Sequence, residues 1–245
     1  MTGVRGGGVN GTPAEHGAAS VEKPARPDLS ALTVLEVSGG PGGAFATGML
    51  ADFGARVVVC EPPPRGSALR RLGPPAAQDV WWPIAARNKL SLALDAAHPE
   101  APPVLERLLA GAAVLVRDGP AAPWRAAVAR LPQPPLELHL HPPGADRPAL
   151  WPWGTVPELA AAASGAMALT GEADGPPAQP EMPLADHSAG LLAAALALFE
   201  LRAASLTGRL AVPLGIGLHE VLARMNEWQV VVAAGSVKNL GQAGA

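Results

Sequence analysis

The stretch at residues 32–62 most constrains how this chain of 245 residues can fold. It opens with a short apolar, β-branched run at 32–37, which is typical of a strand buried on both faces of a parallel sheet. Glycines around Pro41 stop that strand, and apolar residues then recur at helical spacing until Gly54, where the helix is expected to end. A second buried run follows at 56–60. The stretch therefore predicts a β-α-β unit with a ligand site at the carboxyl ends of its strands.

The turn GGPGGA at residues 39–44 has the character of an anion site, because free amide groups at a helix N-terminus attract negative charge. Glu61 follows at roughly the distance at which dinucleotide-binding proteins place the acid that holds the ribose. The glycine spacing nevertheless disfavours NAD or FAD. Proline stands inside the turn, and the third glycine of the dinucleotide fingerprint is missing from its position.

The composition limits which kinds of partner and which cellular compartment we expect for this chain. The net charge is only −3, which gives no indication of a nucleic-acid partner. The single cysteine, Cys60, excludes an internal disulfide and fits a reducing compartment, and we expect it to be a small core residue. The first thirty residues lack the apolar segment of a signal peptide, and the most apolar run, 189–199, is about half the length of a membrane span. A cytoplasmic protein that does not bind membranes is expected.

Periodicity predicts one α/β domain at residues 28–234, with a disordered tail at 1–27 and a frayed tail at 235–245. The expected fold is a Rossmann-like parallel sheet with flanking helices. Beyond the opening unit, we expect strands at 90–94, 113–116, 136–141 and 210–214, and helices at 99–110, 122–131, 160–169, 186–204 and 219–232.

The run LELHLH at 136–141 alternates apolar and polar residues, which predicts a half-buried edge strand. His139 and His141 on its polar face could ligate a metal ion, but no third or fourth ligand is evident. We therefore predict no metal site.

Several sequence blocks carry a family resemblance. They are LTVLEVSGGPGGAFATGMLADFGARVVVCEPP, RNKLSLALD, HPEAPPVLERLLAGAAVLVRDGP, SGAMALTGEADGPP, PLADHSAG and TGRLAVPLGIGLHEVL. Together, over residues 32–222, they resemble the class III CoA-transferase family, which includes formyl-CoA and carnitine CoA-transferases and α-methylacyl-CoA racemase. The resemblance implies the large α/β domain of that family and a coenzyme A thioester as substrate or ligand, with no covalently bound cofactor. It also implies a homodimer, or a heteromer with a related subunit.

An arginine-rich loop follows the second strand, on the side of an α/β sheet where ligands bind. Guanidinium groups suit the 3′-phosphate and the pyrophosphate of CoA, although a solvated basic loop is the alternative. Trp81 and Trp82 follow and could pack on adenine, or more simply in the core. With the positions implied by the resemblance, the predicted CoA-binding residues are Gly42, Gly43, Ala44, Arg65, Arg70, Arg71, Arg87, Asn88 and Lys89.

The resemblance also implies an aspartate nucleophile, placed eight residues before the glycine of a Ser-Gly pair. Its carboxylate attacks the thioester and forms covalent intermediates. Counted back from Gly165, that position is Pro157, which cannot be a nucleophile. Glu158 is the nearest carboxylate and our candidate, with Asp146 as the other nearby acid. A helix N-terminal acid that favours the dipole is the alternative role for Glu158.

Two further segments are relevant to the active site that the resemblance implies. Where the family has an Asn-Phe-Arg-Pro-Gly turn after the strand 113–116, this chain has Arg117-Asp118-Gly119-Pro120. Asp186 and His187 begin a long alanine-leucine helix, and we expect both to serve at its capping region, with a catalytic role as the alternative for His187. The chain is thus expected to be a CoA-transferase-like enzyme that passes CoA between carboxylic acids. The alternatives are a non-catalytic CoA-binding or subunit-interaction homologue and a racemase-type enzyme.

Overall fold

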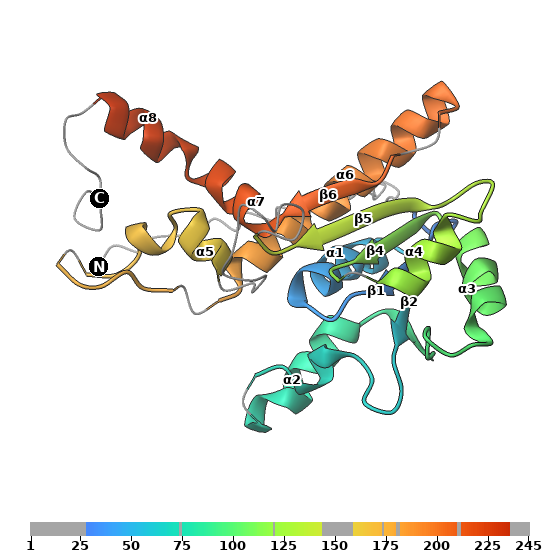
Figure 1. Cartoon of the computed structure of the whole chain (residues 1–245). Coiled ribbons are helices and arrows are strands. Elements are labelled where there is room, and N and C mark those ends of the chain that lie inside the picture. Colours follow the sequence, from blue (N-terminus) through green and yellow to red (C-terminus); the bar gives the residue numbers. More distant parts are fainter. Residues whose placement is uncertain are drawn as a thin grey trace, which may run out of the picture.

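Six parallel strands form one sheet in the part of the chain that the structure describes (Figure 1). The computed structural model describes residues 28–73, 75–119, 121–143, 159–172, 174–179, 182–209 and 212–235, with only the backbone at 75–79, 233 and 235. The strand order is β3-β2-β1-β4-β5-β6. The strands are β1 (Thr33–Val37), β2 (Arg56–Glu61), β3 (Lys89–Ala93), β4 (Val114–Arg117), β5 (Leu136–His141) and β6 (Leu214–Gly217). This confirms the predicted α/β fold with a Rossmann-like parallel sheet.

Helices cover both faces of the sheet. They are α1 (Pro41–Asp52), η1 (Ala68–Arg71), α2 (Pro75–Ala86), α3 (Ala101–Ala110), α4 (Ala122–Val128), α5 (Leu159–Ala163), η3 (Met167–Leu169), α6 (Leu184–Thr207), α7 (Leu218–Met225) and α8 (Glu227–Gly235). One apolar core lies between the sheet and α1 and α6, and a second lies between the sheet and α3 and α4. The predicted tail 1–27 and residues 236–245 of the predicted tail 235–245 fall outside the described residues, while residue 235 ends α8.

The register of β1 explains how one strand serves both cores. Val34 is level with Val57 of β2 and Val114 of β4, and all three join the core beneath α1. Its neighbour Leu35 points to the opposite face and packs with Leu105 of α3. Because successive side chains of a strand alternate between faces, a strand between two helical layers must be apolar at nearly every position.

The opening β-α-β unit forms as predicted. Helix α1 begins at Pro41, where the missing amide of proline costs nothing, and its N-cap is Gly40. Gly54 lies just past its end with φ of +98°, a conformation that suits glycine. Cys60 is buried among the residues of the second core, and burial raises the pKa of its thiol to about 12.

Close packing of α1 against α6 depends on small residues. Ala189, Gly190 and Ala193 lie on the buried face of α6. A Cβ on Gly190 would stand 2.5 Å from the carbonyl oxygen of Gly42, which only glycine avoids. The two helices therefore approach each other at backbone distance, next to the glycine-rich turn.

Three predicted elements differ from the structure. Strand β5 lies between β4 and β6, so it is not the predicted edge strand. Its polar residue Glu137 is buried and forms an ion pair with Arg117. The last strand begins at Leu214, because Pro213 has no amide to contribute to the ladder. The helix expected at 219–232 is divided at Asn226 into α7 and α8.

Two more helices depart from expectation. The segment 160–169 is not one helix: Gly165, with φ of +80°, separates α5 from η3. Helix α6 spans 24 residues and is longer than the predicted helix 186–204. By length and composition alone it could cross a membrane, which the shorter apolar run 189–199 did not indicate.

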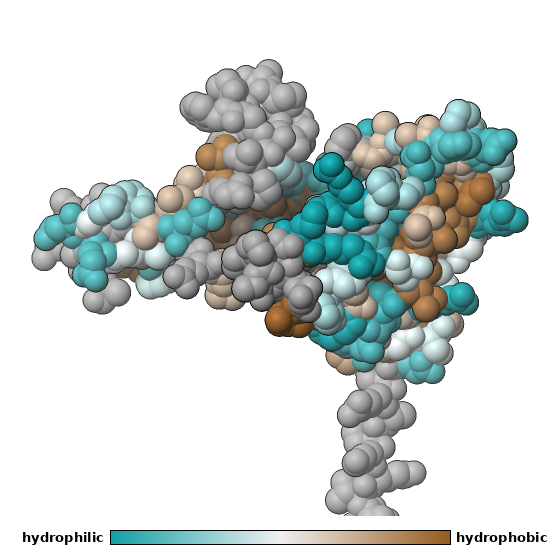
Figure 2. Space-filling model, turned by 90° about the horizontal axis from the view of Figure 1, so that it is seen from below, coloured by the Kyte–Doolittle hydropathy of each residue, from teal (hydrophilic) through white to brown (hydrophobic). Residues whose placement is uncertain are grey.

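Apolar side chains are also exposed. Phe199 and Leu206 of α6 are 69% and 67% exposed, and Trp228 and Val231 of α8 are 58% and 71% exposed. Helix α8 extends away from the sheet in Figure 1. The face shown in Figure 2 carries hydrophilic and hydrophobic areas side by side.

Candidate functional site

A cavity of about 770 Å³ lies at the carboxyl ends of the strands. Its walls come from the turn at residues 39–43, from the ends of β4 and β5, from the start of α6 and from α7. The chain runs from β1 toward β2 and β3 on one side and through β4 toward β5 and β6 on the other. The cavity therefore stands where the strand order reverses, the position at which open α/β sheets bind ligands.

The amide groups of the glycine-rich turn are bound by a carboxylate of the protein itself. Gly39 N–H donates to both oxygens of Asp118, at 3.0 and 2.9 Å, and Gly40 N–H donates to Asp118 Oδ2 at 2.5 Å. Gly42 N–H donates to Asp186 Oδ1 at 3.3 Å. A Cβ on Gly40 would stand 2.8 Å from Asp118 Oδ2, so a side chain there would force this carboxylate to shift.

Sequence reasoning missed these contacts. Asp118 and the turn are 79 residues apart, and the signal that could have found them was the position of Asp118 directly after a strand adjacent to β1. Asp186 lies in the first turn of α6 as predicted, and there it accepts a hydrogen bond from Gly42 N–H of the glycine-rich turn. His187 lies in the capping region and contacts the carbonyl oxygen of Pro183 through Nδ1, at 2.9 Å.

The pKa of Asp118 is raised above its ordinary value by burial, and the negative charge of Glu36 raises it further. The N–H groups of Gly39 and Gly40 act in the opposite direction, because they stabilise the ionised form. Asp118 is therefore a half-buried carboxylate with two backbone donors, at the edge of a cavity.

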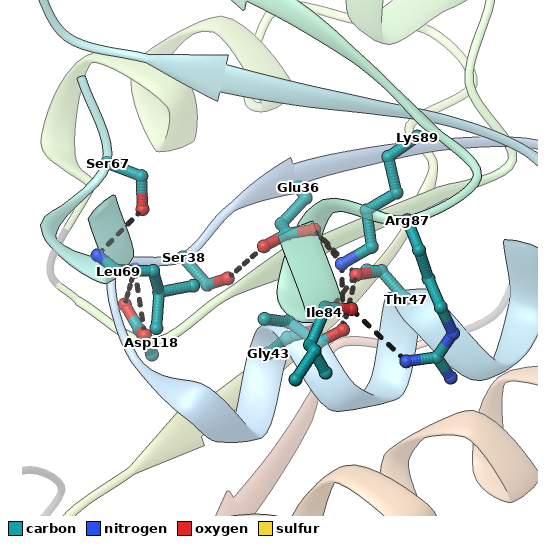
Figure 3. Close-up of polar contacts among 12 residues, drawn as sticks. Glu36, Ser38, Gly43, Thr47, Ser67, Leu69, Ile84, Arg87, Lys89 and Asp118 are labelled. Atoms are coloured by element: carbon teal, nitrogen blue, oxygen red, sulfur yellow. Dashed lines mark hydrogen bonds and ion pairs between the residues drawn. The ribbon is translucent and has the colours of Figure 1, made fainter. Parts of the chain in front are cut away.

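Beside the turn, a second carboxylate organises a buried polar network (Figure 3). Glu36 on β1 accepts hydrogen bonds from Ser38 Oγ at 2.9 Å, Thr47 Oγ1 at 2.6 Å and Lys89 Nζ at 2.9 Å. Lys89 also donates to the carbonyl oxygen of Ala44 at 2.8 Å. Both charged side chains are 1% exposed, and burial lowers the pKa of Lys89. The ammonium group of Lys89 thus donates into the fold rather than toward the cavity, and contact between Lys89 and CoA stays a prediction.

The predicted arginine loop borders the cavity. Ala68 and Leu72, at either end of the 3₁₀ helix η1, line it. Arg70 forms paired hydrogen bonds with Glu61, at 2.6 and 2.8 Å, and its guanidinium lies 3.9 Å from the ring centroid of Trp82.

Glu61 is held by several groups at once. It also accepts from Ser67 N–H at 2.8 Å and from Ser91 Oγ at 2.6 Å. The hydrogen bond from Arg70 is the largest of the effects that lower the pKa of Glu61 to about 2. The acid at the end of β2 therefore shapes the arginine loop, and Trp82 packs against that loop.

Arg65 and Arg71 remain on the surface of the same loop. Both side chains are exposed, and Arg71 Nη1 donates to the carbonyl oxygen of Arg65 at 2.6 Å. Neither arginine is among the residues that line the cavity, to which this loop contributes Ala68 and Leu72.

The structure does not bring Arg87 and Asn88 to the glycine-rich turn. Both donate to Asp52, at the C-terminal end of α1, whereas the turn is at its N-terminal end. Asn88 adopts φ of +60°, which asparagine tolerates better than most residues. The predicted CoA-binding residues therefore form two groups at opposite ends of one helix. Gly42 and Gly43 line the cavity at the strand ends, whereas Ala44, one residue further along α1, lines a smaller cavity between α1 and α2.

A smaller apolar cavity of about 290 Å³ lies between α1 and α2. Its walls include Phe45, Leu69, Trp81 and Ile84, so Trp81 lines a cavity while Trp82 holds Arg70.

The nucleophile predicted from the resemblance cannot be placed. Glu158, Pro157 and Asp146 lie outside the described residues. The Ser164–Gly165 pair is described, at the end of the short helix α5.

A parallel sheet with reversed strand order, and a cavity bordered by the glycine-rich turn and by the loop that carries the arginines, define a Rossmann-like α/β protein with a candidate ligand site. Comparison with known proteins makes the assignment specific. The chain belongs to CoA-transferase family III, whose family model matches residues 29–126 and 153–245. The resemblance seen in the sequence blocks is thereby confirmed.

Named relatives agree with this assignment. The chain is 32% identical over 221 residues to succinyl-CoA–D-citramalate CoA-transferase of Chloroflexus aurantiacus, a match that covers 84% of this chain and 53% of the relative. It is 27% identical to human succinyl-CoA:glutarate CoA-transferase, over 67% of this chain and 39% of the relative. The chain thus spans about half the length, or less, of these relatives.

Solved structures agree at the level of the fold. A CaiB/BaiF family protein from Brucella suis superposes with a TM-score of 0.73 at 22% identity, covering 87% of this chain and 59% of that protein. A hypothetical protein from Mycobacterium tuberculosis gives 0.72 at 22% identity, over 86% and 60%.

Proposed function

We propose that this chain binds CoA thioesters at the 770 Å³ cavity and takes part in the transfer of CoA between carboxylic acids. The observation that carries the proposal is the position of the arginine loop, which borders the same cavity as the glycine-rich turn at the reversal of the strand order. Cationic side chains beside an open cavity suit the phosphates of CoA, and the cavity has room for an acyl group. Membership of a CoA-transferase family supports the same assignment.

The described cavity wall bears on which acyl group the CoA thioester carries. The relatives named above act on succinyl-CoA, which has a free carboxylate at its far end. Among the described residues that line the cavity, the ionisable side chains are Asp118, Asp186 and His139, with no lysine or arginine. A succinyl donor would therefore need a cation from beyond these residues, so we propose a carboxylic acyl-CoA without naming the acid.

A related subunit is a suitable partner. Two of the relatives are named as the alpha and beta subunits of succinyl-CoA–L-malate CoA-transferase. The exposed apolar side chains of α6 and α8 add a surface that association would bury. We propose that the chain works as a homodimer or together with a related chain.

A second candidate function is CoA binding without catalysis. It is favoured by Pro157, which stands where the sequence resemblance places the aspartate nucleophile. A transfer assay separates the two functions: the chain is incubated with a series of acyl-CoA donors, succinyl-CoA among them, and with acceptor acids, and new acyl-CoA is followed by chromatography. A binder gives no new acyl-CoA.

Calorimetry with CoA tests the binding itself. Arg71→Ala is the better variant, because Arg70 also holds Glu61 and its loss would disturb the loop. Loss of one charge-assisted contact is expected to weaken binding by about tenfold or more. Arg130→Ala is the matched control, since this exposed arginine pairs with Glu106 of α3 and does not line the cavity, so the affinity of this variant for CoA should equal that of the unmodified chain. Absence of binding at millimolar CoA would refute the proposal.

A further inference from the structure

Two cavities lie side by side at the N-terminal end of α1. Pro41, the first residue of that helix, lines both the cavity of about 770 Å³ and the cavity of about 290 Å³ between α1 and α2. The 3₁₀ helix η1 also contributes residues to both walls. At the start of α6, Asp186 lines the larger cavity and its neighbour His187 lines the smaller one. A ligand bound in the larger cavity is therefore within reach of the smaller one.

The two walls differ in their chemistry. The larger cavity has the carboxylates of Asp118 and Asp186 in its wall. Among the residues that the structure describes, the smaller cavity is lined by no carboxylate, and most of its side chains are apolar, including Phe45, Leu69 and Trp81. Because a charged or polar group loses free energy when it is desolvated without a partner, the smaller cavity suits an uncharged hydrocarbon group.

The two ionisable side chains of the smaller wall already have partners. Arg87 Nη2 donates to Asp52 Oδ2 at 2.5 Å, and Arg87 Nε donates to the other oxygen of the same carboxylate at 3.2 Å. His187 Nδ1 lies 2.9 Å from the carbonyl oxygen of Pro183, and its ring packs edge-on against Phe45 with the centroids 4.8 Å apart. A hydrocarbon group leaves these interactions intact, whereas a carboxylate would have to compete with Asp52 for Arg87.

Apolar surface at this cavity is left in contact with water. Val80 and Ile84 of α2 line it, and they are 59% and 50% exposed. Covering such surface with a hydrocarbon chain is favourable, because it removes apolar area from water. A volume of about 290 Å³ is close to the lower limit of the roughly 300–1,000 Å³ that is usual for small-molecule sites. The cavity therefore has room for a hydrocarbon chain but not for a whole CoA thioester.

We infer that the smaller cavity binds the hydrocarbon chain of an acyl-CoA thioester, an inference that rests on the proposed function. The thioester group lies in the larger cavity, and the chain extends past Pro41 into the smaller one. Proline suits this position between the cavities, because its ring is apolar and it has no N–H group to leave unpaired. The substrate class is thus a hydrocarbon acyl-CoA rather than the CoA thioester of a dicarboxylic acid.

Calorimetry with a series of CoA thioesters on the unmodified chain tests the inference. Acetyl-, butyryl-, hexanoyl- and octanoyl-CoA differ only in the length of the hydrocarbon chain. Each methylene that is buried should tighten binding by about threefold, so octanoyl-CoA is expected to bind at least about 10²-fold more tightly than acetyl-CoA. Suberoyl-CoA is the matched ligand, because its chain is as long but ends in a carboxylate, and it should bind more weakly than octanoyl-CoA.

Two results of this series would overturn the inference and leave the proposed function standing. One is equal affinity for acetyl-CoA and octanoyl-CoA. The other is tighter binding of suberoyl-CoA than of octanoyl-CoA. Absence of binding by every thioester would instead refute the proposed function, and this inference with it.

A variant locates the chain in the smaller cavity. Ala85 of α2 lines that cavity, so Ala85→Leu places a larger side chain in it. We expect octanoyl-CoA to bind at least about tenfold more weakly to this variant, with the affinity for acetyl-CoA unchanged. Ala86→Leu is the matched control, because it adds the same atoms at the next position of α2, which lines neither cavity, and it should keep the preference for octanoyl-CoA.

The outcome for Ala85→Leu is decisive in both directions. An equal loss of affinity for acetyl-CoA and octanoyl-CoA would mean that the smaller cavity holds part of CoA itself, and it would refute the inference. An unchanged preference for octanoyl-CoA would refute it as well. If Ala85→Leu does not fold, the series of thioesters on the unmodified chain still decides the question.

Discussion

The buried pair of Lys89 and Glu36 allows a quantitative test of how this site is built. Each side chain is 1% exposed, and Nζ and Oε2 are 2.9 Å apart. Lys89→Met retains a side chain of similar length but removes the ammonium group. It therefore leaves the carboxylate of Glu36 buried without its counter-ion, while the hydroxyl groups of Ser38 and Thr47 continue to donate.

The magnitude follows from this environment. Breaking a buried ion pair by removing one partner costs about 3–5 kcal/mol, because an uncompensated charge remains in the interior. Two hydroxyl donors remain, so we expect the lower end of this range, about 3 kcal/mol. For a domain of this size that corresponds to a fall in Tm of roughly 6–12 °C.

Urea unfolding followed by circular dichroism measures the effect. The matched control is Arg130→Met, which breaks an ion pair whose side chains are 51% and 38% exposed and should cost less than about 1 kcal/mol. Adding Glu36→Gln to Lys89→Met removes the stranded charge and should restore part of the loss, so the two changes are not additive. A cost below about 1 kcal/mol for Lys89→Met, or additive costs in the double variant, would show that the pair does not stabilise the fold as argued.

Two more variants test other parts of the structure. Arg70 is the largest cause of the lowered pKa of Glu61, about 2 against an ordinary 4.5. The stability from ionised Glu61 is therefore present above about pH 4.5 and lost as the pH falls toward 2, and Glu61→Gln should flatten urea-unfolding stability over that interval; an unchanged pH profile would contradict this. Gly190→Ala places a Cβ 2.5 Å from the carbonyl oxygen of Gly42 and should cost about 1–3 kcal/mol by thermal unfolding. Gly111→Ala meets only ordinary contacts and should be neutral or stabilising, so equal losses in both variants would refute the packing argument.

Local patterns predicted most of the sheet. The runs at 32–37, 56–60 and 113–116 are apolar at nearly every position because their strands lie between two helical layers, whereas the run at 90–94 forms the edge strand β3, which is largely exposed. All four strands were placed to within one residue. Alternation misled at β5. Its polar residues suggested a solvent-facing side, but Glu137 is buried by pairing with Arg117. A pattern of polar residues does not reveal whether water or a side chain will satisfy them.

The candidate site was predicted in part. The glycine-rich turn and the arginine loop were identified from their residue types, and the structure places both beside one cavity. The partners of individual charges could not be predicted, because Lys89 meets Glu36 across 53 residues and Asp118 meets Gly39 across 79. Such contacts depend on which strands become neighbours.

By itself, then, the sequence determined the fold class, the family and the edge of the sheet at which the cavity lies, because these depend on local periodicity and on blocks of residues in a fixed order. Only the tertiary structure decided which charges are free to meet a ligand. Arg65 and Arg71 remain exposed, whereas Lys89 is buried against Glu36. The turn at residues 39–44 has its first amides bound by Asp118. The physical reason is that parallel strands are joined by long crossover connections, so the ends of β1 and β4 are neighbours in space but far apart in the sequence.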